Sequence, residues 1–329
     1  MKISVIGSGG WGTALAILLN SKKHDVTLWS WQESECETLK RDRENKAFLP
    51  GVAIPDGIRF TSDLKGAVSS AEAVVTVLPS HRMRVYAKEM APYAKGKLII
   101  NCTKGLEPET LKTMTECIEE EIPGATVAAL SGPSHAEEVA RFIPTAVVAA
   151  SKEMAVAETV QDIFMCETFR VYTSTDVLGV EIGGALKNVI ALCAGMVDGI
   201  GYGDNTKAAL MTRGLVEIIR LGKALGAKPE TFMGLTGNGD LIVTCTSMHS
   251  RNRRAGILLG KGKTLKEALE EIHMVTEGVT SCSAAYELSK KCGVEMPIVN
   301  EAYAVLYKDK SAKQAVLDLM NRGRKEECF

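Results

Sequence analysis

Neither sign of charge is in excess in this sequence. Its 39 lysines and arginines nearly balance 40 aspartates and glutamates, which leaves a formal net charge of −1 over 329 residues. Proteins that hold nucleic acid or an anionic membrane surface through their overall field carry a marked basic excess. We therefore expect no nucleic-acid partner, and any anion that the protein binds must be held by a local group of residues.

Cysteine pairs of the C-x-x-C type are also missing, although the chain has nine cysteines. Their odd number and irregular spacing suit free thiols in a reducing compartment better than a disulfide framework. The apolar run that ends at Ile6 is shorter than the core of a signal peptide. We expect a cytoplasmic protein and predict no metal site.

A long uncharged hydrophobic run is the third feature that the sequence lacks. The longest weakly charged stretch, Ile182–Val197, contains Lys187. It falls short of the roughly 20 apolar residues that a membrane span needs. The stretch therefore predicts a buried helix and no membrane insertion.

Short apolar runs alternate with helix-length segments through the first half of the chain. The runs are continuously apolar, as in parallel strands that helices cover on both faces. The predicted strands are Ile3–Ile6, Val26–Trp29, Ala73–Leu78, Leu98–Cys102, Val127–Leu130 and Thr145–Ala150. This pattern predicts an α/β domain with a doubly wound, Rossmann-type parallel sheet over residues 1–178.

Helical patterns dominate from about Asp176 onward. The predicted helices are Val177–Val197, Ala208–Leu225, Arg253–Leu259, Thr264–Ile272, Ser281–Lys291 and Ala312–Leu319. A second, all-helical domain over residues 179–329 is therefore expected, in agreement with the chain length. No Pro/Gly/Ser-rich linker separates the two domains, so the change of pattern alone places the boundary near residue 178.

Three glycines, Gly7, Gly9 and Gly12, form a G-x-G-x-x-G motif between the strand Lys2–Ile6 and the helix Thr13–Asn20. In this setting the first glycine permits a tight turn, the second lets the backbone approach a pyrophosphate, and the third allows close packing of helix and strand. The helix N-terminus offers N–H groups and the positive end of its dipole to the phosphates. The motif predicts a bound dinucleotide; a glycine-rich turn without a ligand is the alternative.

The acidic residue that usually follows about 20 positions later, and binds the ribose 2′-hydroxyl of NAD, is missing. The second strand ends in Trp29-Ser30-Trp31-Gln32, and Glu33 is the nearest carboxylate. No arginine stands at this strand end to hold the 2′-phosphate of NADP. The choice between NAD and NADP therefore stays open.

Lys187 is the only charged residue between Ile182 and Val197, within a predicted helix. A buried ammonium group is costly unless it is paired or has a chemical task, and burial lowers its pKa toward the range in which it can exchange a proton with a substrate. The alternative is a lysine at the helix rim that reaches solvent or a salt bridge. Gly183 and Gly184, just before it, would allow a cofactor or a second helix to come close.

Two segments of the helical half could hold an anion or present a carboxylate. The run Ser250-Arg251-Asn252-Arg253-Arg254 precedes an apolar helix and suits a phosphate ester, although a solvated basic face is the alternative. The run Gly237-Asn238-Gly239-Asp240 is compatible with a hairpin turn or with a glycine loop that presents Asp240 to a substrate or a lysine.

Two further segments follow predicted strands at the edge where open α/β sheets bind ligands. These are Lys104-Gly105-Leu106-Glu107 and Ser131-Gly132-Pro133-Ser134. Either could be a simple turn, but together they crowd one rim of the predicted sheet.

The ordered set of motifs resembles the bacterial-type NAD(P)-dependent glycerol-3-phosphate dehydrogenases nearly from end to end. The shared stretches are Gly7-Ser8-Gly9-Gly10-Trp11-Gly12-Thr13-Ala14, Phe48-Leu49-Pro50, Pro79-Ser80-His81, Thr103-Lys104-Gly105-Leu106-Glu107, Ser131-Gly132-Pro133-Ser134, Gly183-Gly184-Ala185-Leu186-Lys187-Asn188, Gly239-Asp240-Leu241 and Ser250-Arg251-Asn252. The resemblance implies a Rossmann domain followed by a helical domain like that of 6-phosphogluconate dehydrogenase. It also implies reversible hydride transfer between NAD(P)H and dihydroxyacetone phosphate, giving sn-glycerol 3-phosphate for phospholipid synthesis, and a homodimer.

The resemblance also implies roles for single residues. Lys187 is similar in position to the family's general acid/base, while Arg251 and its two neighbours correspond to the grip on the phosphate. The substrate contacts that it implies are Lys104, Gly132, Ser134, Asp240, Ser250, Arg251 and Asn252. The dinucleotide contacts that it implies, beside Gly7, Gly9 and Gly12 of the motif, are Gly10, Trp11, Trp31, Lys104, Ala136, Arg251, Val275 and Glu277.

Two positions depart from the family pattern. The family often carries a basic residue or histidine where Trp31 stands, which leaves the specificity for the adenosine side open. Its usual Gly-Leu-Gly-Asp loop has Asn238 in place of leucine, with an effect that the sequence does not define.

Two other functions are compatible with parts of this pattern. A β-hydroxyacid dehydrogenase of the same architecture would bind a carboxylate, which arginine also grips. A non-catalytic dinucleotide sensor would need the glycine turn but neither Lys187 nor Asp240.

Overall fold

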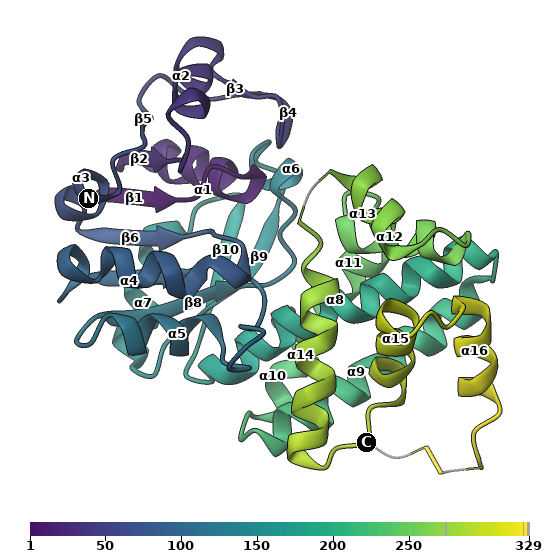
Figure 1. The fold of residues 1–329 in the computed structure, drawn as a ribbon. Coiled ribbons are helices and arrows are strands. Elements are labelled where there is room, and N and C mark those ends of the chain that lie inside the picture. The colour runs from purple at the N-terminus through teal and green to yellow at the C-terminus, as the bar shows by residue number, and fades with distance from the viewer. Residues whose placement is uncertain (274, 325, 328–329) are drawn as a thin grey trace. The chain divides into compact units, whose positions relative to one another are not determined.

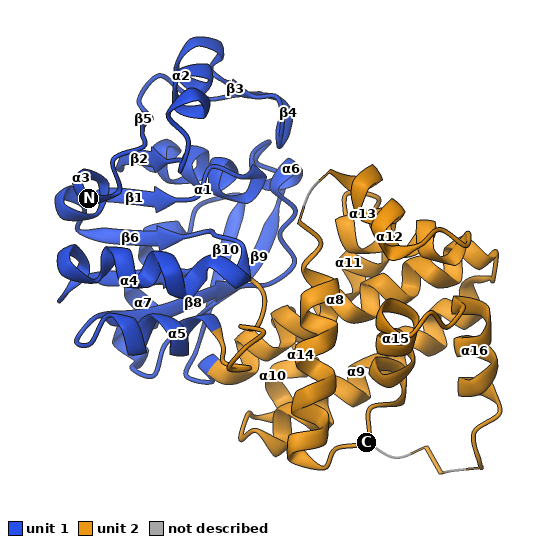
Figure 2. Cartoon of the chain, viewed as in Figure 1, with its two compact units in different colours: residues 1–103, 114–177 blue, residues 104–113, 178–329 orange. Residues whose placement is uncertain are grey.

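The computed structural model describes residues 1–273, 275–324 and 326–327. The chain forms two compact units, and Figure 2 shows them in different colours. Unit 1 contains residues 1–103 and 114–177, and unit 2 contains residues 104–113 and 178–329. The expected domains, 1–178 and 179–329, differ from these units in the segment Lys104–Thr113, which packs with unit 2 because Leu106 lies in its hydrophobic core.

Unit 1 is a sheet with helices on both faces (Figure 1). Its strands are β1 (Lys2–Ile6), β2 (Asp25–Trp29), β5 (Arg59–Thr61), β6 (Ala73–Thr76), β7 (Leu98–Asn101), β8 (Thr126–Ser131), β9 (Thr145–Ala150) and β10 (Phe169–Ser174), and a hairpin is made by β3 (Glu44–Asn45) and β4 (Leu49–Ala53). Its helices are α1 (Gly10–Ser21), α2 (Glu33–Asp42), α3 (Leu64–Ser70), the 3₁₀ turn η1 (Ser80–Arg82), α4 (Met83–Ala94), α5 (Met114–Glu121), α6 (Ala136–Val139) and α7 (Met154–Phe164).

The strand order is β10-β9-β8-β7-β6-β1-β2-β5. The chain leaves β1 toward β2 on one side and later returns to β6 on the other, so the end of β1 lies at a topological switch point, where such sheets bind ligands. Along β1, Ile3 and Val5 pack into the core shared with α1 and α7, whereas Ile6 packs on the opposite face with α3, α4 and α5. The doubly wound α/β prediction is confirmed.

One pair of strands contradicts the prediction of an entirely parallel sheet, because β8 and β9 are antiparallel. A parallel return needs a crossover that runs along the sheet. The connection between these strands contains only α6, a helix of four residues. Two strands of the large sheet were not predicted: β5 has three residues, and β10 alternates buried Phe169 and Val171 with exposed Arg170 and Tyr172. The hairpin strands β3 and β4 were not predicted either.

Unit 2 is built from helices in its described part, apart from a β-bridge between Leu106 and Thr113. They are α8 (Val177–Ile200), α9 (Asp204–Ala224), α10 (Pro229–Met233), the π-helical turn η2 (Leu235–Gly239), α11 (Asp240–Thr246), α12 (Arg251–Gly260), α13 (Leu265–Ile272), α14 (Glu277–Cys292), α15 (Pro297–Tyr307) and α16 (Ala312–Met320). The predicted helical domain is confirmed; α10, α11 and α15 were not among the predicted helices.

Helix α8 is the central helix of unit 2. It begins at Val177, as predicted, and ends at Ile200 rather than Val197. By length and composition alone this helix could cross a membrane, contrary to the length argument made from the stretch Ile182–Val197. Its apolar 18-residue window is 89% buried inside the protein, however, which confirms the prediction of a buried helix.

Glycines bring α12 against α8. A Cβ on Gly256 would lie 2.0 Å from the Leu192 carbonyl oxygen, and one on Gly195 would lie 2.0 Å from the Arg253 carbonyl oxygen. Only glycine permits such a close approach of two helix backbones. This contact determines where the N-terminus of α12, which carries Ser250 as its N-cap, lies relative to α8.

Candidate active site

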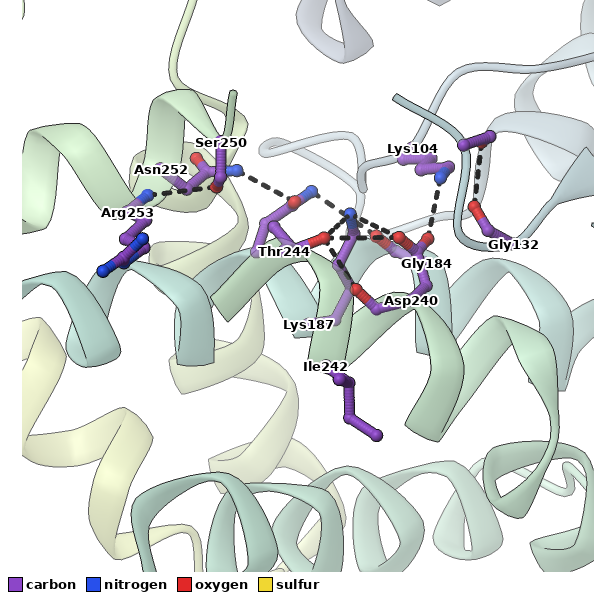
Figure 3. Close-up of polar contacts among 12 residues, drawn as sticks. Lys104, Gly132, Gly184, Lys187, Asp240, Ile242, Thr244, Ser250, Asn252 and Arg253 are labelled. Carbon is purple, nitrogen blue, oxygen red and sulfur yellow. Dashed lines mark hydrogen bonds and ion pairs between the residues drawn. The ribbon is translucent and has the colours of Figure 1, made fainter. Parts of the chain in front are cut away.

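Lys187 lies near the middle of α8 and is only 6% exposed. Its Nζ donates to Oδ1 of Asp240 at 2.9 Å and to Oγ1 of Thr244 at 2.7 Å (Figure 3). The lysine therefore lies inside unit 2 rather than at a helix rim with its ammonium group in solvent, and its salt bridge is part of a buried cluster. Two of its three N–H donors are used by the described residues, which leaves one for a ligand.

Asp240 is the first residue of α11 and follows the π-helical turn η2. The hairpin alternative for Asn238-Gly239 is wrong, because the turn continues directly into a helix with no flanking strands. Gly183 of α8 lets this turn approach, since a Cβ there would lie 2.7 Å from the Thr236 carbonyl oxygen. The glycine loop thus presents Asp240 to a lysine, which was the other alternative.

A second lysine, Lys104, belongs to the same cluster. It lies in the segment 104–113, which packs with unit 2 although the residues before and after it belong to unit 1. Lys104 donates from Nζ to Oδ2 of Asp240 at 2.7 Å, so the carboxylate lies between two ammonium groups. Burial alone would raise the pKa of Asp240, but Lys104 and Lys187 outweigh it and hold that pKa below its ordinary value. Asp240 is therefore an anion that fixes the position of both lysines.

Burial lowers the pKa of Lys187 from 10.5 to about 8. Asp240 acts in the opposite direction, and the positive charge of Lys104 adds to the lowering. Thr244 lies one turn after Asp240, donates its hydroxyl proton to the Asp240 carbonyl oxygen at 2.6 Å, and so offers a lone pair to the ammonium group. A lysine held in this way can give and take a proton close to neutral pH.

Helix α12 begins with the candidate phosphate grip. Ser250 is its N-cap and accepts a hydrogen bond from the Arg253 backbone N–H at 3.2 Å, and no acidic residue lies in the first turn. Arg253 is not part of a solvated basic face, because its side chain is only 13% exposed and donates to Asp198 at 2.8 Å. Arg251, the first helical residue, thus starts a helix whose N-terminal charge is positive.

Asn252 is held by both ends of its side-chain amide. Its Nδ2 donates to Oδ1 of Asn188 at 2.9 Å, and its Oδ1 accepts from the Gly278 backbone N–H at 2.8 Å. The first bond ties α12 to the residue that follows Lys187, and the second ties it to the start of α14, where Glu277 lies. Asn252 thus connects three helices of the site.

The glycine turn in unit 1 has the geometry that a dinucleotide requires. Gly7 has φ +121°, and a Cβ there would lie 2.3 Å from the Val77 carbonyl oxygen, while a Cβ on Gly12 would lie 1.8 Å from the Gly7 carbonyl oxygen. By contrast, a Cβ on Gly9 would meet nothing within 4 Å. No side chain caps the helix that begins here, so open space and helix amides coincide at this point.

Trp11 supplies a second indication that this turn accommodates a ligand. Its indole Nε1 is buried and has no hydrogen-bond partner among the residues that the structure describes. A buried N–H group without a partner destabilises the folded protein unless a ligand or a water molecule accepts its hydrogen bond. Ala136, at the start of α6, lies beside the turn, since its Cβ is 3.7 Å from where a Cβ of Gly10 would be. The residues present therefore fit a nicotinamide dinucleotide.

Four further predicted site residues lie in loops of unit 1 or just before a helix of unit 2. Gly132 and Ser134 follow β8 in unit 1, where the Ser134 hydroxyl donates to the Gly132 carbonyl oxygen at 2.9 Å. Trp31 follows β2 and is 66% exposed. Val275, in unit 2, is 40% exposed and lies just before α14.

Two contributors were not predicted, namely Thr244 and Asn188. Asn188 is the last residue of the shared motif Gly183–Asn188, and the sequence assigns it no role of its own. The signal for Thr244 is its spacing of four from Asp240, which places both side chains on one face of a helix. That signal is available only once a helix is expected after the glycine loop. Within the described residues, no group of three or more His, Cys, Asp or Glu side chains could hold a metal ion.

A Rossmann-type sheet with a dinucleotide turn, in a chain that also has a buried lysine with a pKa lowered to about 8, is typical of the class of NAD(P)-dependent oxidoreductases. Models of the N-terminus and the C-terminus of NAD-dependent glycerol-3-phosphate dehydrogenase match residues 2–157 and 176–317. The chain belongs to the NAD-dependent glycerol-3-phosphate dehydrogenase family and is an NAD(P)-dependent enzyme.

Individual relatives cover nearly the whole chain. The glycerol-3-phosphate dehydrogenase [NAD(P)+] of Fusobacterium nucleatum is 54% identical over 99% of this chain and 98% of its own length. That of a Thermoanaerobacter species is 55% identical over 99% of both. The crystal structure of glycerol-3-phosphate dehydrogenase from Coxiella burnetii superposes with a TM-score of 0.94 at 36% identity, covering 98% of this chain and 99% of that one. The resemblance inferred from the motifs is confirmed.

Proposed function

We propose that this enzyme reversibly reduces dihydroxyacetone phosphate to sn-glycerol 3-phosphate, with Lys187 as its acid/base group. The observation that carries the proposal is the buried Lys187–Asp240–Lys104 cluster, in which the pKa of Lys187 is lowered to about 8. Membership of the family supports the substrate, and the burial of the lysine supports its role.

A bound NAD(P)H supplies the hydride that reduces the carbonyl carbon. In the direction of ketone reduction, Lys187 donates a proton from Nζ to the carbonyl oxygen, which becomes the hydroxyl group. The neutral amine of Lys187 then takes a proton back from solvent. Asp240 remains ionised and keeps the ammonium group in position, and Thr244 fixes its second N–H. In the reverse direction the neutral amine of Lys187 accepts the hydroxyl proton.

The phosphate end of the substrate is assigned to the start of α12. Arg251, with the backbone and side chains of Ser250 and Asn252, provides positive charge and donors there. Binding energy from this remote group orients the reacting carbon. Lys104 and Asp240, together with Gly132 and Ser134 of unit 1, are the remaining proposed substrate contacts.

The dinucleotide contacts are likewise a proposal. Support comes from the open space at Gly9, the unpaired indole of Trp11 and the position of Ala136 beside Gly10. The complete proposed set is Gly7, Gly9, Gly10, Trp11, Gly12, Trp31, Lys104, Ala136, Arg251, Val275 and Glu277.

Substitution of Lys187 tests the proposal. Lys187→Ala should lower kcat for dihydroxyacetone phosphate by about 10²–10⁴-fold while NADH binding, measured by fluorescence titration, is unchanged. Lys187→Met, which retains the apolar stem, should lose as much activity, because the proton and not the volume matters. Undiminished turnover in either variant would contradict the role of Lys187. A parallel assay with 3-oxo acids separates a phosphate-binding enzyme from a β-hydroxyacid dehydrogenase.

The proposed cellular setting follows from the cysteines and from the family. No disulfide joins the eight cysteines that the structure describes, which supports a reducing compartment such as the cytoplasm. The family resemblance supports a homodimer without membrane insertion and a role in glycerophospholipid synthesis. Light scattering coupled to size-exclusion chromatography gives the oligomeric state directly.

A further inference from the structure

The end of β2 lies directly beside the dinucleotide turn. The Gly7 backbone N–H donates to the Trp29 carbonyl oxygen at 3.1 Å. Ser30 follows and is 1% exposed, and its backbone N–H donates to the Thr61 carbonyl oxygen at 3.0 Å. In NAD-binding domains an acidic residue at this strand end binds the ribose 2′-hydroxyl. Here the position holds a buried serine.

A carboxylate nevertheless reaches this position from the next helix. The Ser30 hydroxyl donates to Oε2 of Glu35, which lies in the first turn of α2. Glu33, in the same turn, accepts a hydrogen bond from the Ser62 hydroxyl just after β5. The acidic group that the sequence does not show at the end of β2 is therefore supplied five residues later in the chain.

The charge of these two carboxylates is not neutralised by ion pairs. In the described part of the chain, neither Glu33 nor Glu35 makes one. The basic side chains of this region pair with other carboxylates, namely Lys40 with Glu37 at 2.7 Å, Arg41 and Lys46 with Asp42 at 2.7 and 3.1 Å, and Arg43 with Asp56 at 3.6 Å. The strand end therefore carries net negative charge.

Trp31 strengthens this inference. Trp31 lies just after β2, and its indole is 66% exposed. An indole offers an apolar face to an adenine ring but no positive charge to a phosphate. The side that would have to bind a 2′-phosphate thus presents an aromatic ring and two carboxylates.

We propose that this enzyme selects NADH over NADPH, and that Glu35, held by Ser30, is the residue that discriminates between them. Its carboxylate accepts a hydrogen bond from the ribose 2′-hydroxyl and repels a 2′-phosphate. The proposal rests on the dinucleotide site of unit 1 and does not depend on the role of Lys187.

Equilibrium binding tests this without turnover. Dissociation constants for NADH and NADPH are measured by quenching of tryptophan fluorescence, with wild type and with Lys187→Ala. We expect NADH to bind at least about tenfold more tightly than NADPH in both, because like charges in contact disfavour a partner strongly. The difference should shrink with added salt. Equal affinity for the two dinucleotides in wild type would overturn the proposal, whatever the activity of the Lys187 variant.

Variants of α2 assign the effect to one residue. Glu35→Gln should tighten NADPH binding and weaken NADH binding, reducing the ratio by roughly fivefold or more. Glu37→Gln is the matched control, because Glu37 lies on the same helix but pairs with Lys40, and it should leave the ratio unchanged. An unchanged ratio in Glu35→Gln, or an equal change in Glu37→Gln, would show that Glu35 does not discriminate.

Discussion

The ammonium group of Lys187 lies 2.9 Å from Oδ1 of Asp240, although 53 positions separate the two residues in the chain. The same carboxylate holds Lys104 through its other oxygen, 136 positions away. Because one buried anion serves two cations, removal of any member changes the proton affinity of Lys187 in a defined direction. The pH dependence of the reaction is therefore the most direct probe of this site.

The pH profile of wild type follows from the pKa of Lys187, which is about 8. Reduction of dihydroxyacetone phosphate needs the protonated form, so kcat should fall as the pH rises through about 8. Oxidation of glycerol 3-phosphate needs the neutral amine and should rise over the same range. Steady-state rates in both directions check this, and profiles that move in parallel would contradict it.

Two variants should move this profile in opposite directions. Asp240→Asn removes the anion that raises the pKa of Lys187, so the fall in reduction rate should begin at lower pH. Lys104→Gln removes the cation that lowers this pKa, so the fall should begin at higher pH. The measurement is the apparent pKa of kcat in the variants. Shifts of the same sign would show that the cluster does not tune the lysine electrostatically.

Arg251 should affect binding of the phosphate more than chemistry. Arg251→Ala is expected to raise KM for dihydroxyacetone phosphate by about 10–100-fold, because hydrogen bonds to a charged group contribute about 1.5–3 kcal/mol. The KM for an unphosphorylated ketone should change little in this variant. Arg322→Ala, an exposed arginine that pairs with Glu295 in the same unit, is the control. Equal losses for both ketones would argue against a phosphate contact.

The close approach of α8 and α12 should tolerate no side chain at Gly256. In Gly256→Ala, the new Cβ would lie 2.0 Å from the Leu192 carbonyl oxygen, so the helices must move apart. We expect a loss of about 1–3 kcal/mol in the free energy of unfolding, seen as a lower midpoint in urea. Gly323→Ala, where a Cβ meets nothing within 4 Å, should leave the midpoint nearly unchanged. Equal midpoints for both variants would contradict the packing argument.

Glu217 should make stability depend on pH. It is 4% exposed and accepts from the backbone N–H groups of Ile298 and Val299 at 2.7 and 3.2 Å, at the start of α15. Burial raises its pKa from 4.5 to about 7, so the folded state binds the proton more tightly than the unfolded one. This contribution is fully present below about pH 4.5 and is lost as the pH rises through 7.

Glu217→Gln isolates that contribution, because glutamine does not titrate. Relative to wild type, the variant should become progressively more stable between about pH 5 and pH 8. Urea unfolding of both proteins across this range provides the comparison. A difference in stability that does not change with pH would show that Glu217 is ionised at all these values.

The central strands of unit 1 were predictable because they are continuously apolar and covered on both faces. The edge strands β5 and β10 were not, since one is three residues long and the other alternates exposed and buried side chains. Helix α15 was not predicted, although Pro297 lies in its first turn. Part of its N-terminal capping comes from Glu217 in α9. A contact between residues so far apart in the chain leaves no pattern in the sequence around the helix.

The sequence by itself determined which parts this protein has. A glycine turn after a buried strand, a single lysine in the apolar stretch Ile182–Val197 and a basic run before another helix are local patterns. Their chemistry follows from residue type and spacing. Only the tertiary structure decided how they pair. It placed Asp240 between Lys187 and Lys104, joined residues 104–113 to the helical unit, and brought Glu35 onto Ser30 at the end of β2. These pairings depend on burial and backbone approach between distant segments, which no window of sequence contains.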